Sequence, residues 1–458
     1  MKKSIITIAA ALFATFTFAQ VSNEAEHNLT GNDNQGFTEQ SGNFNQAYLT
    51  VSGNDNVSDQ YQLGNGNYST VEQYGDENTS YQLFSGDDNY ATLSQEGDLN
   101  VSNMIVNGDE NDIYATQTGN FNIIDLSIDG NNNTADLLQY GNNNEAMVTI
   151  DGDGNYTWVD IDGNGNYVNQ MISGNDNYAD AWVIGDNNEA IETQIGNGNS
   201  ILVDQFGDDN QTTIAQDGDG NFSYTGQYGN ENEVTVTQTG DYNYNRTFQS
   251  GDNNVATIDQ TGVSNMNFAS QSGNSNELSL SQDGISNYSS LYQGGNSNIA
   301  QLDQLGDGND IYMNQHGNSN EVYAEQTGNG NELNAYQNGE GNQLYSSQTG
   351  DNNTTTVWTE GDYNFVSAMV AGGEGNVIDI AQDGDGNITN VELQDGSDFN
   401  NVDISQTGDD NMIGETMFGD GVLISGDNNL STITQNGMMN SAKTTIMGNG
   451  NTSGIIQH

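Results

Sequence analysis

Residues Gln238 to Asn243 read QTGDYN, and eleven residues further on Gln249 to Asn254 read QSGDNN. The same Gln-x-Gly-x-x-Asn motif returns along the chain in both directions. From Gly31 to Gly361, an eleven-residue step lands on a glycine at all 31 positions, and an asparagine follows each glycine three residues later. A short fixed period of this kind is typical of stacked, nearly identical units rather than of a globule with one central core.

Each eleven-residue unit predicts one short β-strand and one tight turn. Counted from the asparagine, positions +2, +4 and +6 are mostly apolar, small or Gln; Asn276, for example, is followed by Leu278, Leu280 and Gln282. Alternation with a period of two is typical of a strand with one buried face. The turn comes from the glycine, which tolerates positive φ, and from Asn or Asp, which hydrogen-bond to their own backbone.

The residue at the Gln position indicates how many units make one full coil. It is Gln in 21 of the 31 regular units. The substituted positions Phe84, Val106, Ile128, Ile150 and Ile172 recur every 22 residues, as expected if side chains that stack on one another return once per coil. The sequence therefore predicts an all-β, flattened β-solenoid with two strands per 22-residue rung. About 19 rungs at ~4.8 Å each would give a body ~90 Å long.

Inward amide side chains at this spacing predict hydrogen-bonded ladders along the stack. Identical amides one rung apart can each donate to the next, which satisfies polar groups that would be costly to bury alone. A preference of Asn for turns explains the asparagines but not an inward Gln at fixed spacing. The predicted ladder residues are Gln205, Asn210, Gln216, Asn221, Gln227, Asn232, Gln238, Asn243, Gln249, Asn254, Gln260, Asn265, Gln271, Asn276, Gln282 and Asn287. The predicted turn glycines beside them are Gly207, Gly218, Gly229, Gly240, Gly251, Gly262, Gly273 and Gly284.

The first residues are typical of a secretory signal peptide. Lys2 and Lys3 precede an apolar run that is too short to span a bilayer, and small residues precede Gln20. We predict a signal peptide over residues 1–19, cleaved between Ala19 and Gln20, and a short lead over residues 20–28. The repeat array is expected over residues 29–458, regular to about residue 364.

The array is less regular over residues 365–458. After Gly361 the glycines follow at Gly373, Gly384, Gly396, Gly408, Gly419, Gly426, Gly437 and Gly448, with unequal steps. The short step to Gly426, and Val422 in place of a turn asparagine, predict a bulge or a distorted rung near this point. Drift of a tolerant turn is the alternative explanation.

The composition restricts the partners. The chain has a formal net charge of −60 at pH 7, and Arg246 and Lys443 are its only basic residues beyond the predicted signal. Such a surface repels nucleic acid and anionic lipid, so we expect neither nucleic-acid binding nor membrane insertion. Cysteine is absent, so stability does not come from disulfides, and the absence of proline suits uninterrupted strand pairing. Low hydrophobicity with high charge would ordinarily indicate disorder, but a disordered chain has no reason to keep a strict period.

The motif resembles the curlin repeat of curli, the functional amyloid of bacterial biofilms. Residues 249–260, QSGDNNVATIDQ, carry the pattern Gln-x-Gly-x-x-Asn-x-Ala-x-x-x-Gln, and the likeness covers nearly the whole array. The resemblance implies a β-solenoid subunit, similar to the curli major subunit, that crosses the outer membrane unfolded through export machinery. It also implies nucleation at the cell surface and stacking into extracellular fibres for biofilm matrix, adhesion and aggregation.

The ends of the array bear on assembly. The final unit, from Asn451 to Gln457, keeps the inward pattern, and the first strand is expected soon after the signal. Open strand edges template the addition of another copy, so the expected partner is a second copy of the chain, added head to tail.

Two other functions stay open. Acidic turn residues such as those in Gly207–Asn210 (GDDN) would repel one another along the stack, or could take up calcium in a monomeric acidic adhesin or stalk. An ice-binding solenoid would need a flat outward threonine row, which the mixed outward positions do not provide. His27, His316 and His458 are far apart in sequence and in register, and there is no cysteine and no phosphate-binding loop in helical context, so we expect no enzyme, no cofactor and no metal site. Inward Glu192 and Glu415 indicate local distortion or protonated groups.

Overall fold

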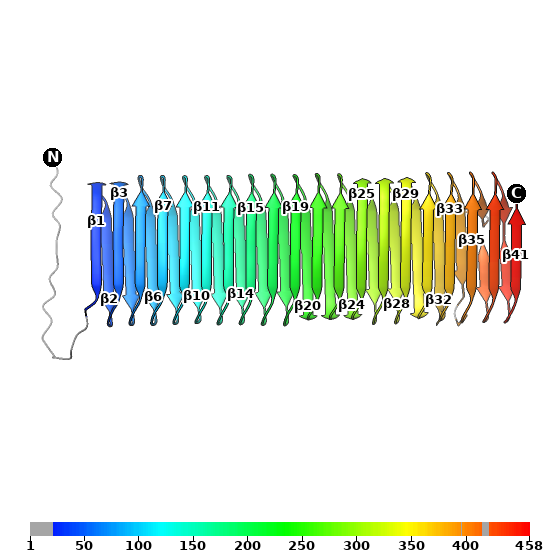
Figure 1. Ribbon diagram of the computed structural model, residues 1–458, viewed down its shortest axis with the longest axis horizontal. Helices are drawn as coiled ribbons and strands as arrows, with labels where there is room; N and C mark the ends of the chain where they lie inside the picture. Colours follow the sequence, from blue (N-terminus) through cyan, green and yellow to red (C-terminus); the bar gives the residue numbers. More distant parts are fainter. Residues whose placement is uncertain (1–21, 395, 415–420) are drawn as a thin grey trace.

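The alternating residues of each unit form a β-strand, and the strands stack along one axis in chain order (Figure 1). The computed structural model describes residues 22–394, 396–414 and 421–458. The predicted signal peptide, its cleavage site at Ala19 and Gln20, and Glu415 lie outside these residues. Within them there is no helix long and apolar enough to cross a membrane.

From β1 to β35, successive strands point in opposite directions and belong alternately to two facing sheets, each of which is parallel throughout. The first sheet consists of β1 (Glu24–Asn32), β3 (Gln46–Asn54), β5 (Tyr68–Tyr74), β7 (Tyr90–Glu96), β9 (Asp112–Thr118), β11 (Thr134–Tyr140), β13 (Tyr156–Asp162), β15 (Tyr178–Ile184), β17 (Ser200–Phe206), β19 (Phe222–Tyr228), β21 (Tyr244–Ser250), β23 (Met266–Ser272), β25 (Tyr288–Asn296), β27 (Asp310–Asn318), β29 (Glu332–Glu340), β31 (Thr354–Glu360), β33 (Val377–Asp383), β35 (Asn401–Thr407), β38 (Leu430–Asn436) and β41 (Thr452–Gln457).

The second sheet consists of β2 (Gln35–Ser41), β4 (Val57–Leu63), β6 (Thr79–Ser85), β8 (Val101–Asn107), β10 (Ile123–Asp129), β12 (Glu145–Asp151), β14 (Tyr167–Ser173), β16 (Glu189–Ile195), β18 (Gln211–Asp217), β20 (Glu233–Asp241), β22 (Val255–Val263), β24 (Glu277–Ile285), β26 (Ile299–Leu305), β28 (Glu321–Thr327), β30 (Gln343–Asp351), β32 (Phe365–Glu374), β34 (Ile388–Leu393), β36 (Met412–Ile413), β37 (Val422–Ser425), β39 (Ser441–Ala442) and β40 (Thr444–Met447). At its last two levels this sheet is built from two short strands each, β36 with β37 and β39 with β40.

The pairing register confirms the predicted rung. Glu24 pairs with Gln46, and Val255 pairs with Glu277, a step of 22 residues in both sheets. Each rung therefore contains two strands and two turns. The predicted fold, a flattened β-solenoid of about 19 rungs, is confirmed.

The core is a thin layer between the two sheets. Each regular strand points three side chains inward, as β22 does with Ala256, Ile258 and Gln260, all of them buried. Aliphatic side chains fill the middle of this layer, and buried amides flank them on both edges. Because the layer is only one side chain deep from each sheet, each rung buries its apolar surface only by stacking on its neighbours.

The first strand begins earlier than expected. β1 starts at Glu24, inside the segment 20–28 that the sequence suggested as a lead, and Glu24 to Asn32 pair along their whole length with β3. The residues of β1 are exposed, so their pairing rather than their burial defines the strand.

The rung lengthens toward the C-terminus. The step between paired residues grows from 22 to 23 at Thr354 and Val377, to 24 at Val377 and Asn401, and to 29 at Asn401 and Leu430. It returns to 22 at Leu430 and Thr452. Extra residues are therefore inserted at several separate positions, and the strands remain paired across each insertion.

The turn at Gly396 in the irregular series differs from the regular turns. Beside Gly396, it is the carbonyl oxygen of Ser397 that accepts a hydrogen bond from Asn376 Nδ2 (2.7 Å), as glycine carbonyls do elsewhere. Gly419 lies outside the described residues; β36 and β37, which precede and follow it in the chain, both pair with β34 and so share one level. Val422 lies in β37 and is buried, so the expected distortion is an insertion within one strand level.

Candidate functional site

The glutamines form continuous ladders inside each sheet. In the second sheet, Gln260 Nε2 donates to Gln282 Oε1 (2.8 Å) and to the carbonyl oxygen of Tyr244 in the first sheet (3.0 Å). The same pattern joins Gln194 to Gln348 in the second sheet and Gln205 to Gln337 in the first. Each Gln therefore connects two rungs and also ties the two sheets together.

The turn asparagines form ladders that donate in the opposite direction. Asn254 Nδ2 donates to Asn232 Oδ1 in the preceding rung (3.0 Å) and to the carbonyl oxygen of Gly273 in the following rung (2.8 Å). The Asn254 backbone N–H also donates to Asn232 Oδ1. One asparagine thus links three rungs, which explains why the position holds Asn throughout the regular array.

The turn glycines stack on one another at very close range. The eight glycines predicted from the sequence have φ between 101° and 136°. A Cβ atom built on Gly251 would lie 2.2 Å from the carbonyl oxygen of Gly273. The predicted asparagines and glycines therefore form one unit at each turn, in which the glycine carbonyl accepts a hydrogen bond from the asparagine Nδ2 and no larger residue fits in place of the glycine.

A third ladder, which was not among the expectations from the sequence, runs along the outside of the turns. Where Asp or Asn follows the glycine, its side chain accepts a hydrogen bond from the backbone N–H of the same position one rung earlier; Asp186 N–H donates to Asp208 Oδ1 and Asp208 N–H to Asn230 Oδ1, both at 2.9 Å. The turn carboxylates are thus backbone acceptors as well as solvated charges. The signal was available as the run of Asp and Asn after the glycines.

Replacing Gln260 with Leu should destabilise the stack by about 1–3 kcal/mol. The substitution removes a donor to Gln282 Oε1 and an acceptor for Gln238 Nε2, both of them buried. Denaturant unfolding of the unassembled chain measures the change, with Thr257→Ser, an outward position of the same strand, as the control. Equal stability of the Gln260→Leu and control proteins would show that the ladder gives no net stabilisation.

The two outer faces of the solenoid differ in their aromatic residues, although the same eleven-residue motif forms the strands of both sheets. All three tryptophans, Trp158, Trp182 and Trp358, lie on the outer face of the first sheet. Rings on this face contact one another from rung to rung, as Tyr68 and Tyr90 do with centroids 4.8 Å apart and planes at 5°. The outer face of the second sheet has two shorter series, Phe37–Tyr61–Tyr81 and Tyr323–Tyr345–Phe365. Separating the outward residues by alternate units would have shown this difference.

Carboxylates lie among the rings of the first sheet. Tyr156 Oη donates to Asp136 Oδ2 (3.0 Å), and Tyr178 Oη donates to Asp180 Oδ2 (3.1 Å). Burial, followed by the hydrogen bond to and the charge of Asp136, raises the pKa of Tyr156 to about 12. Burial and the charge of Asp180 raise the pKa of Tyr178 to about 12. These tyrosines therefore stay protonated donors at any physiological pH.

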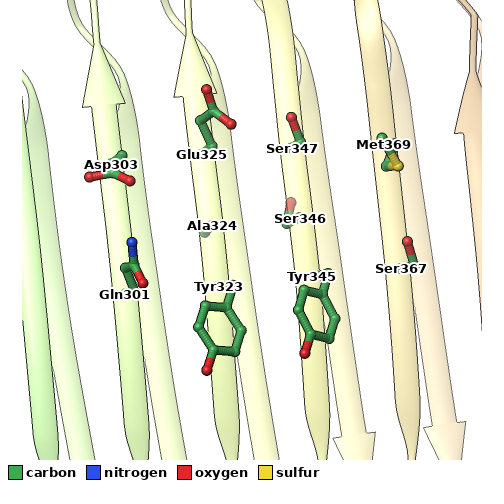
Figure 2. A pocket seen from close by; sticks show the side chains of 10 residues that line it. All are labelled: Gln301, Asp303, Tyr323, Ala324, Glu325, Tyr345, Ser346, Ser347, Ser367 and Met369. Carbon is green, nitrogen blue, oxygen red and sulfur yellow. The ribbon is translucent and has the colours of Figure 1, made fainter. Parts of the chain in front are cut away.

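The second sheet has an open groove across β26, β28, β30 and β32 (Figure 2). Its volume is about 370 Å³, and the small inward side chains of Ala324 and Ser346 form its floor. Tyr323 and Tyr345 stack along one side with centroids 5.1 Å apart. Burial and the charge of Glu325 raise the pKa of Asp303. The groove offers ring faces, hydroxyls and carboxylates to a ligand that lies along the stack.

Neither the histidines nor the acidic side chains form a metal centre in the described ranges, where no group of three or more His, Cys, Asp or Glu side chains could hold an ion. His27 hydrogen-bonds to Thr38 Oγ1 (2.7 Å), and His316 lies between the rings of Tyr292 and Tyr336 on the first sheet. Glu192 is buried in the core, where its Oε2 accepts from Gln170 Nε2 (3.1 Å).

Comparison with known proteins agrees with this geometry. The family model of the curlin associated repeat matches residues 86–119, 207–240 and 273–306. Each match begins and ends at a turn glycine and contains three half-rungs. A comparison with curated proteins gives no match.

Proposed function

Since this chain is a curlin-repeat protein, we propose that it is a secreted structural subunit whose copies stack end to end into curli-like amyloid fibres. The fibres would lie outside the cell, attached to its surface, and serve biofilm matrix, adhesion and aggregation. A surface nucleator and outer-membrane export machinery are the partners that such a subunit needs. The repeat family and the solenoid fold indicate a structural protein rather than an enzyme.

The observation that carries this proposal is the open edge at each end of the described stack. Within the described residues, β1 and β2 pair with strands on one side only, and so do β39, β40 and β41. The turn at Gly448 has no stacked carbonyl in front of it, whereas Gly251 inside the stack has one. A further copy that continued the 22-residue register would extend the strands, the amide ladders and the glycine stacks together.

Assembly is tested by dilution of the chain from denaturant into buffer with and without calcium, followed by thioflavin fluorescence and electron microscopy. We expect fibres in both buffers, with a cross-β reflection near ~4.8 Å along the fibre axis. Preformed fragments should shorten the lag, because an existing edge templates the next copy. A chain that stays monomeric, above all one stabilised by calcium, would overturn the proposal in favour of a monomeric adhesin or stalk.

A further inference from the structure

The outer face of the first sheet has a groove in which indole rings and carboxylates alternate. Its volume is about 250 Å³, and it is lined by Trp158, Asp160, Asp180, Trp182 and Asp204 from β13, β15 and β17. It faces solvent on the side of a sheet, away from the strand edges at the ends of the stack. Its ligand would therefore reach it in a single chain or in a fibre.

The pairing register produces this alternation. Trp158 pairs with Asp180, Asp160 with Trp182, and Trp182 with Asp204. Neighbours in register lie about 4.8 Å apart along the stack, so each carboxylate is next to an indole in the adjoining strand. Trp182 consequently lies between Asp160 and Asp204 in one row.

The groove presents ring faces as well as negative charge. Trp158 is 38% exposed and Trp182 is 45% exposed. Trp182 contacts Phe206 edge to face, with centroids 5.0 Å apart and planes at 75°. This contact holds the indole in place beside the carboxylates. A ring quadrupole and a carboxylate attract the same kind of group, an organic cation.

The carboxylates of the groove are held close together in partly buried positions. Burial raises the pKa of Asp160 and of Asp180, and the charges of Asp204 and Asp160 raise that of Asp180 further. The groove contains no basic residue, since Arg246 and Lys443 are the only described Arg or Lys and neither lines it. A bound cation would offset the repulsion between these carboxylates.

The same face already holds one guanidinium on aromatic rings. The Arg246 Cζ atom lies 4.6 Å from the ring centroid of Phe248 and 6.0 Å from that of Tyr224. Tyr224 Oη in turn donates to Asp204 Oδ2 at 2.6 Å, so this arginine is linked to the edge of the groove through one tyrosine. Ring spacing on this sheet therefore suits a planar cation laid across two rungs.

We propose that the groove formed by Trp158, Asp160, Asp180, Trp182 and Asp204 binds the guanidinium group of an arginine-bearing peptide segment of a partner protein. The guanidinium stacks on an indole and donates hydrogen bonds to the flanking carboxylates, which arginine can do with one planar group. Because the groove is on a face and not at a strand edge, this interaction is separate from assembly.

The test measures binding of a fluorescently labelled, blocked arginine hexapeptide to the full chain by anisotropy. Asp160→Asn with Asp180→Asn should weaken binding about tenfold at low salt, because the charge-assisted hydrogen bonds are lost. Asp379→Asn with Asp403→Asn is the matched control: it removes two neighbouring outward carboxylates from β33 and β35 of the same sheet. The control should change affinity less than about twofold.

The tryptophans are tested separately. Trp158→Leu with Trp182→Leu keeps every charge and should also weaken binding about tenfold, through loss of the ring faces. In a Trp358→Phe background the two groove tryptophans are the only ones left, and the peptide should change their fluorescence. Circular dichroism verifies that each variant keeps its β-structure. Equal affinities of all variants and the control would overturn the proposal. They would show that the peptide is attracted to the acidic surface as a whole and not to the groove.

Discussion

Gly306→Ala should destabilise the stack by about 3 kcal/mol or more, whereas Gly308→Asn in the same turn should change stability by less than about 0.5 kcal/mol. Gly306 has φ +117°, and a Cβ on it would lie 2.1 Å from the carbonyl oxygen of Gly328. That oxygen also accepts a hydrogen bond from Asn309 Nδ2 (2.9 Å). Relief of the clash would move the two rungs apart and break this bond, so the loss is large.

Gly308 is the matched control because its environment is open. It has φ +63°, and nothing lies within 4 Å of a Cβ built on it. The equivalent turn position elsewhere holds Asn253 and Asn352 at φ 59° and 55°. Asparagine tolerates this left-handed conformation. It also has fewer conformations than glycine in the unfolded chain, and this lower entropy offsets part of the strain in the folded chain.

Unfolding in guanidinium chloride measures the free energies of unfolding of the wild type, Gly306→Ala and Gly308→Asn. Because each rung contacts only its neighbours, the Gly306 substitution should also divide the stack, which limited proteolysis would detect as cleavage near this turn. We also expect slower fibre growth, because the glycine stacking that Gly306→Ala disrupts between rungs is the same contact that we propose between copies. Equal stability of Gly306→Ala and Gly308→Asn would refute the close glycine stacking.

Glu192→Gln should stabilise the fold at neutral pH and reduce its pH dependence. Glu192 is 1% exposed, and its Oε1 atom is buried without a hydrogen-bond partner. In register it lies between Gln170 and Ile214, at a place where the core otherwise holds neutral groups. Burial, and then the charge of Asp180, raise its pKa well above the ordinary value of 4.5.

The direction of the pH effect follows from proton binding. Below the ordinary pKa the carboxyl is protonated in both the folded and the unfolded chain, so its titration does not change the free energy of unfolding. As the pH rises above that value, the unfolded chain releases the proton and the folded chain keeps it. The free energy of unfolding then falls by about 1.4 kcal/mol per pH unit until the folded pKa is reached. The contribution of Glu192 is therefore least unfavourable on the acidic side, and it lowers the stability of the stack as the pH increases.

Unfolding curves of the wild type and Glu192→Gln across the range of about pH 4 to 8 measure this effect. The difference in their free energies of unfolding should be near zero at the acidic end and grow with pH. Glu189→Gln, on the outward side of the same strand, is the control for loss of one negative charge. Parallel curves for wild type and Glu192→Gln would contradict a protonated carboxyl in the core.

The repeat period, the strand and turn assignment and the 22-residue rung could all be determined from the sequence. Their cause is local: a strand of fixed length followed by Gly-x-x-Asn closes each half-rung in the same way, and the series from Phe84 to Ile172 marks the coil. The amide and glycine positions were also identifiable, because one residue type recurs wherever identical side chains stack.

Only the tertiary structure decided the features that depend on packing between rungs. The 22-residue step alone would pair Trp158 with Asp180 and Asp160 with Trp182, but the groove between these side chains depends on how they pack on the face of the sheet. The single level shared by β36 and β37 and the role of Ser397 likewise depend on stacking, because an insertion leaves the flanking strands paired. A repeat specifies its own conformation and register through short-range geometry, whereas grooves and insertions depend on side-chain and strand packing between rungs, which the spacing alone does not give.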